Sequence, residues 1–330
     1  MTEQRPPTLQ DVADRAGVSR ALVSIVIRNA PGASEATRVR VRQVAAELGY
    51  RPDHRARLLA GRSSRLLGVT LALSNPFHAD LIEAIYPAAD ALGYQVVLSA
   101  VTGRRTPRQA VDTLLDYRCE AALLIGPLPS AAELAELATQ RPVLVVGQPS
   151  RAAGVDVVRA AGDHGLRLAV DHLVGLGHRR IWHLDGGRAP GAAERRTGYK
   201  RAMRSAGLAE ESRVISAGQT EADGAATARE LGAAPLPDAV VTYNDRCAVG
   251  LLDQFARLGI AVPAQLSVVG YDDSQVARLP YLQITTVSQD ASALAGEAVR
   301  RAVARLAGSI EPAELVVTPK LIVRDTTAAR

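Results

Sequence analysis

The sequence predicts a small all-α helix-turn-helix module followed by an α/β body of two doubly wound lobes, each built on a parallel sheet. Three observations lead to this fold class. The first fifty residues carry short apolar stripes at helical spacing. Residues 67–330 alternate short apolar runs with amphipathic segments, which is typical of parallel sheets covered by helices on both faces. With 330 residues, 47% of them hydrophobic, the chain is long enough for this plan.

Three helices are expected within residues 1–50. The first begins after the capping residue Thr8 and ends at Gly17, where a left-handed backbone is favoured. Ser19 caps a second helix over residues 20–27, and Ser34 starts a third. A helix, a tight glycine turn and a second helix, braced by a third, form the helix-turn-helix layout.

Positive charge is concentrated in this part of the chain. Residues 1–66 contain 12 arginines against 6 acidic residues, whereas the remaining residues are close to neutral. Guanidinium groups make bidentate contacts with phosphate and with guanine edges. The basic module therefore points to a polyanionic partner, while charge alone is equally compatible with a solvated basic surface.

The strings TLQDVADRAGVSRALVS and SEATRVRVRQVAAELGYRP resemble the DNA-binding headpiece of LacI-family transcriptional regulators. The resemblance implies that the second helix enters the major groove and that Arg20, Ala21 and Ile25 read bases. Ile25 stands where the family often has arginine, so its base contact would be apolar, for example with a thymine methyl. The alternative is that Ile25 packs against the headpiece core. The other DNA contacts implied in the headpiece are Thr8, Ser19, Ser24, Arg28 and Arg38.

Residues 51–66 read as an arginine-rich linker, and they also resemble the hinge helix of the same family. The resemblance implies that Arg55 contacts DNA and that Leu59 wedges into the minor groove. Wedging unstacks bases at a cost of a few kcal/mol and bends the duplex. A helix this short is marginal alone, so we expect it to order on DNA.

Seven strands are expected in the body, at residues 67–73, 95–100, 121–125, 143–146, 181–184, 239–242 and 266–270. Ligands of such folds lie beyond the carboxyl ends of the strands, so the polar residues that follow strands are informative. These are residues 74–78, 243–245 and 270–273. Each of them, taken alone, is also compatible with ordinary turn chemistry.

Taken together, GVTLALSNPF, ERRTGYKRAM, YNDRCAVG, LSVVGYDDS and LIVRDTTA resemble the effector-binding core of the LacI family, which is similar in fold to periplasmic sugar-binding proteins. The resemblance implies a first lobe of about 67–163 and 289–319 and a second lobe of about 164–288 and 320–330. It places an effector pocket between the lobes. The implied pocket residues are Phe77, His78, Arg195, Asn244 and Asp272.

Three positions depart from the sugar-binding pattern. Gln219 occupies the place where sugar-binding members often carry a stacking aromatic. Gly126 and Gly147 fall where polar side chains contact the ligand in other members. A sugar, a related metabolite and a different or larger ligand therefore all stay open as effectors.

The sequence lacks the common enzyme and metal-site motifs. The first strand is not followed by GxGxxG, and GxxxxGK[ST], GxSxG and HExxH are absent. Cys119, Cys247 and the six histidines lack metal-site spacing, so no catalytic residue, metal or cofactor is expected. The N-terminus has no apolar export signal, and no apolar run approaches the roughly 20 residues of a membrane span. We therefore expect a cytoplasmic protein with no membrane contact.

These features predict a sequence-specific transcriptional regulator, a repressor, whose operator affinity is controlled by a small-molecule effector. One headpiece contacts few base pairs, so we expect a homodimer on a near-palindromic double-stranded site. Whether the effector releases or strengthens DNA binding stays open. The alternative is a sugar-type binding protein whose main role is not DNA binding; it shares the body but does not require the basic module.

Overall fold

A computed structural model describes residues 7–27, 29–50, 63–311 and 313–330. Its contacts divide the chain into two compact units, Met1–Ser64 and Arg65–Arg330. Three of the expected DNA contacts, Arg28, Arg55 and Leu59, lie outside the described residues, as does most of the expected hinge.

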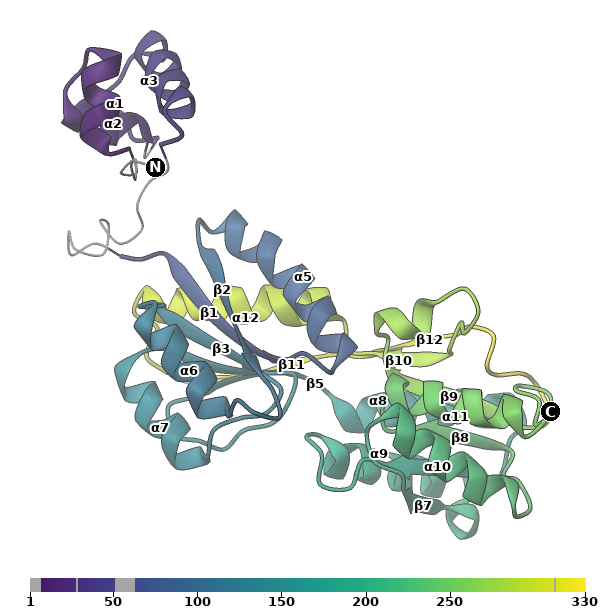
Figure 1. The fold of residues 1–330 in the computed structure, drawn as a ribbon. Helices are drawn as coiled ribbons and strands as arrows, with labels where there is room; N and C mark the ends of the chain where they lie inside the picture. Colours follow the sequence, from purple (N-terminus) through teal and green to yellow (C-terminus); the bar gives the residue numbers. More distant parts are fainter. Residues whose placement is uncertain (1–6, 28, 51–62, 312) are drawn as a thin grey trace. The chain divides into compact units, whose positions relative to one another are not determined.

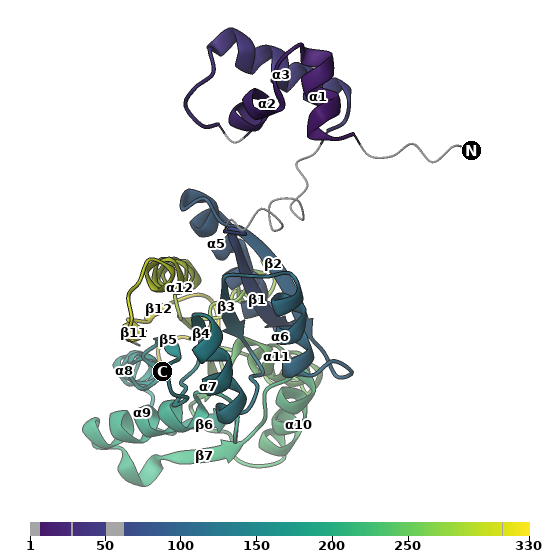
Figure 2. The same cartoon turned by 90° about the vertical axis from the view of Figure 1, so that its left-hand side faces the viewer.

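The first unit contains the three expected helices, α1 (Leu9–Ala16), α2 (Arg20–Ile27) and α3 (Glu35–Glu47) (Figures 1 and 2). Each helix begins at a hydroxyl that accepts a backbone N–H of the first turn, at Thr8, Ser19 and Ser34. Gly17 ends α1 with a φ of 65°, a left-handed conformation that glycine adopts without strain. The buried core of this unit is formed by Val12, Ala13, Ala16, Val23, Val26, Val41 and Ala45.

The first lobe of the body is built on a six-stranded parallel sheet in the order β11-β5-β4-β3-β1-β2. Its strands are β1 (Leu66–Ala72), β2 (Gln95–Val101), β3 (Ala121–Ile125), β4 (Val143–Val146), β5 (Asp156–Ala160) and β11 (Glu314–Val317). Its helices are α5 (Pro76–Ala91), α6 (Pro107–Asp116), α7 (Ala131–Gln140) and α12 (Ala291–Leu306). One face of the sheet packs against α5 and α12, which lie side by side in Figure 1 although they are far apart in sequence. The other face is covered by α6 and α7.

The second lobe repeats this plan with the sheet order β12-β10-β9-β8-β6-β7, in which only the pairing of β10 with β12 is antiparallel among the described strands. Its strands are β6 (Ile181–Asp185), β7 (Arg213–Ser216), β8 (Ala239–Thr242), β9 (Ser267–Asp272), β10 (Thr286–Ser288) and β12 (Lys320–Ile322). Its α-helices are α8 (Gly162–Gly175), α9 (Ala192–Ser205), α10 (Glu221–Gly232) and α11 (Asp245–Arg257), with short 3-10 helices η1 (Ala209–Glu211) and η2 (Gln275–Arg278). The pair α8 and α9 covers one face, and α10 and α11 cover the other.

The chain crosses between the lobes three times: from β5 to α8, from β10 to α12, and from β11 to β12. Each lobe is therefore assembled from segments that are distant in sequence. The expected fold class, a helical module before two doubly wound parallel-sheet lobes, is confirmed.

All seven expected strands are present, with shifts of one or two residues at some ends. The shift at β9 matters for the site, because this strand continues through Tyr271 and Asp272, which the sequence pattern places after the end of the strand. Five further strands, β5, β7, β10, β11 and β12, were not anticipated.

Candidate functional site

One face of α2 is open to solvent. Arg20 and Ala21 are exposed, and Ser24 and Ile25, one turn further along, are half-buried. The opposite face of the helix carries the buried Val23 and Val26. The residues of α2 that are expected to contact DNA, Arg20, Ala21, Ser24 and Ile25, therefore share one accessible surface.

Ile25 lies against the turn that follows α2. A Cβ built at Gly32 would lie 3.7 Å from Cδ1 of Ile25, so the isoleucine side chain covers this glycine. The headpiece core is instead completed by Val23 and Val26 on the other face of the helix. Ile25 is therefore a partly accessible apolar residue at the edge of the open face.

Arg38 of α3 is engaged within the headpiece. Its guanidinium donates to the carbonyl of Ala30 and, over 3.4 Å, to Oδ1 of Asn29. Arg42 donates to the same Asn29 oxygen over 3.0 Å. The two arginines thereby fix the loop between α2 and α3. The phosphate contact expected of Arg38 stays a prediction, with its remaining N–H donors available for it.

The second candidate site is a cavity of about 360 Å³ between the lobes. Its volume is within the range of small-molecule sites. All five pocket residues expected from the sequence line it: Phe77, His78, Arg195, Asn244 and Asp272. The first two come from α5 of the first lobe and the other three from the second lobe.

The first-lobe wall is largely apolar and neutral. Phe77 is buried there beside Leu81 and Ile125. His78 lies near the backbone of Ala72, with the amide of Ala72 3.1 Å from Nδ1. Burial lowers the pKa of His78 to about 4, so the imidazole is neutral at physiological pH.

Gly126 of this wall has a structural reason to lack a side chain. Its φ is 84°, and a Cβ there would lie 2.6 Å from Cε1 of His78. Gly147 also lines the cavity and has a φ of 82°. The two departures from the family pattern are thus positions where the backbone requires glycine, and Gly126 also makes room for the histidine.

Arg195, in the first turns of α9, is the central cation of the second-lobe wall. It is 6% exposed, and its guanidinium carbon lies 3.6 Å from the ring centroid of Tyr271 and 4.7 Å from that of Tyr243. It also donates to the carbonyl of Tyr243 and lies 3.8 Å from the carboxylate of Asp272. Stacking, a hydrogen bond and the nearby carboxylate together hold the guanidinium in a fixed orientation.

The spacing of Arg195 and Gly198, in the segment ERRTGYKRAM, has a packing explanation. A Cβ at Gly198 would lie 2.3 Å from the backbone oxygen of Asp163, at the start of α8. Only glycine at this position lets α9 approach α8 so closely. Gly198 thus lets α9 pack closely against the start of α8. This packing places α9, which carries the buried Arg195, beside the crossing from β5.

Asp272 ends β9 with a φ of 116°, a conformation that side chains other than glycine rarely adopt. Gln289 donates to its Oδ1 over 2.7 Å. Burial raises the pKa of the Asp272 carboxyl, and the cation of Arg195 opposes this rise. Strained backbone and a buried carboxylate together are typical of a functional position.

Asn244 lines the cavity and also makes two structural hydrogen bonds. Its Oδ1 accepts the backbone N–H of Cys247 over 2.9 Å and so caps α11, and its Nδ2 donates to the carbonyl of Gln219 over 3.0 Å. The side chain thus joins the start of α11 to Gln219, which also lines the cavity. One amide hydrogen of Asn244 is left for a ligand.

Several residues that line the cavity were not expected from the sequence. Gln289 follows β10, a strand of three residues that gives almost no signal. Arg246, paired with Glu221 at 2.6 Å, stands two residues after Asn244 in the same motif and could have been included on that ground. Ser74, Asn75 and Tyr243, which belong to the polar segments expected after strands, also line the cavity. The other lining residues, which were not anticipated, are Ala72, Leu81, Ile125, Pro127, Val146, Gln148 and Pro190.

A larger groove of about 850 Å³ runs over the second lobe, between α11 and the segment 276–283. It is lined mainly by apolar side chains, including Tyr281, which is 79% exposed. It contains none of the expected site residues and lies within one lobe. The smaller interlobe cavity, where a buried cation and a buried carboxylate converge, is the better ligand site.

The described ranges hold neither a group of potential metal ligands nor a helix suited to crossing a membrane. No three His, Cys, Asp or Glu side chains there are grouped to hold a metal ion. No described helix is both long and apolar enough to cross a membrane. His183 is buried with Nδ1 2.9 Å from the carbonyl of Val241, as a core histidine.

The helix-turn-helix headpiece, joined in one chain to a two-lobed body with an interlobe cavity, defines a class: DNA-binding transcriptional regulators. Comparison with known proteins gives the family. Residues 8–53 match the bacterial regulatory proteins of the lacI family, and residues 170–327 match the periplasmic binding protein-like domain. The chain belongs to the LacI family, as its motifs indicate.

The similarity to individual relatives extends over 80% of the chain or more. The HTH-type transcriptional regulator GalR of Escherichia coli (strain K12) is 32% identical over 308 residues, which cover 90% of this chain and 88% of GalR. The crystal structure of a LacI transcriptional regulator from a Rhodococcus species is 48% identical, with a TM-score of 0.78, and covers 80% of this chain and 98% of that one. The lac repressor dimer bound to operator and the anti-inducer ONPF is 29% identical, with a TM-score of 0.82, and covers 98% of this chain and 100% of that one.

Proposed function

We propose that this LacI-family regulator is a cytoplasmic repressor, not an enzyme, which binds a near-palindromic operator as a homodimer and is controlled by a small-molecule effector between its lobes. The observation that carries the proposal is the convergence of Phe77, His78, Arg195, Asn244 and Asp272 on one interlobe cavity. A ligand there touches both lobes at once, so it can change the angle between them. The lac repressor dimer, crystallised with operator and anti-inducer together, supports the same arrangement here.

We assign the DNA-binding role to residues 1–50, the hinge to residues 51–66 and the effector and dimerisation role to residues 67–330. The proposed base readers are Arg20, Ala21 and Ile25, and Leu59 is the proposed minor-groove wedge. Phosphate contacts position the protein without specifying sequence. The proposed residues of this group are Thr8, Ser19, Ser24, Arg28, Arg38 and Arg55.

The chemistry of the cavity favours a hydroxyl-rich or heterocyclic effector, such as a sugar or a related metabolite. Arg195 offers N–H donors, and Asp272 offers an acceptor oxygen that Gln289 does not occupy. The apolar wall beside Phe77 offers a surface for a ring face. A ligand with one polar edge and one apolar face would satisfy both walls.

The second candidate function is a small-molecule binding protein without a DNA role. The exposed arginine on α2 argues against it, because Arg20 lies on the solvent-exposed face of the helix-turn-helix, where a guanidinium can contact phosphate or a guanine edge. Selection of the full chain on duplexes with a randomised half-site tests the choice. Enrichment of a near-palindrome, with half-sites about one helical turn apart, supports the regulator. Salt-dependent binding without any enriched sequence would refute it.

A further inference from the structure

An ion pair joins the two lobes beside the proposed effector site. Arg159 belongs to β5 of the first lobe, and Glu194 belongs to the first turn of α9 in the second lobe. Nη1 of Arg159 donates to both carboxylate oxygens of Glu194, over 2.8 and 3.0 Å. The two side chains are only 18% and 27% exposed, so the pair is screened less than one on the surface.

The pair spans the first crossing between the lobes. The chain leaves β5 at Ala160 and enters α8 at Gly162, so Arg159 and Glu194 face each other across this short connection. A Cβ at Gly162 would lie 3.2 Å from Oε2 of Glu194 and 3.4 Å from Cγ of Arg195. The crossing therefore packs directly against the turn of α9 that carries the buried arginine.

Arg159 is also held from its own lobe. Its Nε donates to Oε1 of Glu314 on β11, the strand that leads into the third crossing. One guanidinium thus connects two crossing strands of the first lobe with the helix that presents Arg195. A change in the position of α9 relative to the first lobe must stretch or break its contact with Glu194.

We propose that Arg159 and Glu194 form a latch between the lobes, which positions Arg195 relative to the first lobe and converts ligand contact at Arg195 into a change in the lobe angle. Glu194 is a positioning residue, because its side chain holds the helix from outside the cavity. The proposal rests on the effector site proposed above, but its first test needs no effector. Packed interfaces between lobes switch between discrete arrangements. One ion pair at the crossing from β5 to α8 can therefore favour one lobe arrangement over another.

The first test measures the distance between the lobes in the full-length protein without ligand. Spin labels attached at Asp116→Cys on α6 and Glu230→Cys on α10 report on one lobe each, since both positions are exposed. The native Cys119 and Cys247 are buried and do not compete for the label. We expect a narrow distance distribution in the wild type and a broader or shifted one with Glu194→Ala.

Two further variants separate the latch from general loosening of the fold. Arg159→Met should broaden the distribution at least as much as Glu194→Ala, because it also removes the contact with Glu314. The double variant should match Arg159→Met alone, because the contact between Arg159 and Glu194 is already lost there. Arg201→Ala is the matched control: it removes an ion pair from the same helix, but one made to Asp163 within the second lobe. This control should keep the wild-type distribution.

The second readout is operator affinity on the site selected from the randomised library. Glu194→Ala should change the operator dissociation constant about fivefold or more, the lower end of coupling between sites, while Arg201→Ala stays within about twofold of the wild type. A wild-type distance distribution in Glu194→Ala would overturn the latch, as would an equal change in the Arg201→Ala control. A failed search for effectors would instead count against the proposed function and leave these results standing.

Discussion

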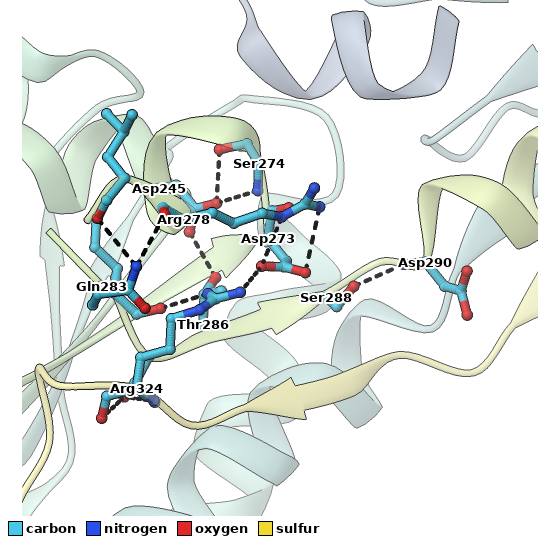
Figure 3. A network of polar contacts seen from close by, with 12 residues as sticks. Asp245, Asp273, Ser274, Arg278, Gln283, Thr286, Ser288, Asp290 and Arg324 are labelled. Carbon is cyan, nitrogen blue, oxygen red and sulfur yellow. Dashed lines mark hydrogen bonds and ion pairs between the residues drawn. The ribbon is translucent and has the colours of Figure 1, made fainter. Parts of the chain in front are cut away.

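Asp245 accepts two hydrogen bonds from Ser274, one from the backbone N–H over 2.7 Å and one from the hydroxyl over 2.8 Å, both at Oδ2 (Figure 3). Its other oxygen, Oδ1, accepts from Oγ1 of Thr286 over 2.6 Å. The first residue of α11 thus holds both the loop after β9 and the strand β10. Burial, together with the nearby Asp272 carboxylate, raises the pKa of the Asp245 carboxyl, so its neutral form is favoured.

We expect Asp245→Ala and Asp245→Asn to differ sharply in stability. Alanine leaves one N–H and two hydroxyls without their acceptor in a buried place, which should lower the free energy of unfolding by about 2–4 kcal/mol. Asparagine can accept both bonds from Ser274 through its oxygen and donate through its nitrogen to Thr286, so the loss should stay below about 1 kcal/mol. Urea unfolding of both variants measures the difference. An equal loss in the two would mean that the negative charge itself is required.

Gly198→Ala should disrupt the approach of α9 to α8. The added methyl would lie 2.3 Å from the backbone oxygen of Asp163, so one helix must move. We expect a loss of about 2–3 kcal/mol, typical of overpacking at a close contact, and with it the loss of ligand binding at Arg195. Gly175→Ala at the end of α8 is the control, because nothing lies within 4 Å of its Cβ. It should be neutral or stabilising by up to about 1 kcal/mol, and similar losses in both variants would contradict the packing argument.

The sequence was most informative where local chemistry determines structure. Hydroxyl caps and Gly17 set the headpiece helices, and continuous apolar runs marked the central strands of both sheets. Short strands were missed where their sequences carry little pattern: β11 alternates exposed and half-buried residues, and β10 has only three residues. Gln289 went unnoticed for the same reason, since it follows β10.

Nor does the sequence reveal how the site residues share their hydrogen bonds. The motif places Asn244 at the cavity, but only the fold shows that this side chain caps α11 and holds Gln219. Likewise, the sequence pattern ends the strand at Gly270, whereas β9 continues to Asp272 and ends there with a positive φ. Such features depend on contacts between segments that are distant in sequence, which local patterns do not encode.

Stability should fall as the pH is lowered through the range set by His183. Burial lowers the pKa of this histidine from 6.5 to about 4, so the folded state resists protonation that the unfolded chain accepts. The stabilisation is therefore fully present above pH 6.5 and is lost as the pH falls from there toward 4, by up to about 3 kcal/mol. His183→Leu should flatten the pH dependence of the free energy of unfolding in this range. If the pH dependence of the free energy of unfolding were unchanged in His183→Leu, the acid sensitivity would come from other groups, such as His78.

Arg195→Ala and Asp272→Ala should each abolish ligand binding while leaving the headpiece intact. Both side chains line the interlobe cavity, and each loss leaves the other group there without its charged neighbour. A thermal-shift screen of sugars, nucleosides and small metabolites first identifies a ligand of the wild type. Arg196→Ala is the matched control, because this next residue pairs with Asp185, at 2.9 Å, and does not line the cavity. If both cavity variants kept the wild-type ligand shift, the assignment of this cavity would be wrong.

Ile25→Arg should change the operator that the protein selects. Arg20 can contact O6 and N7 of guanine, which is worth about 1–3 kcal/mol against a wrong base, whereas Ala21 and Ile25 have no side-chain hydrogen-bonding atoms. Because Ile25 lies at the edge of the open face of α2, an arginine there can extend beyond the Gly32 turn toward a base. Selection on a randomised half-site should therefore show a new preference for guanine at one step, while the guanine next to Arg20 is retained. If the variant folds normally and selects an unchanged sequence, Ile25 is not a base reader. Its side chain would then only pack against the turn at Gly32.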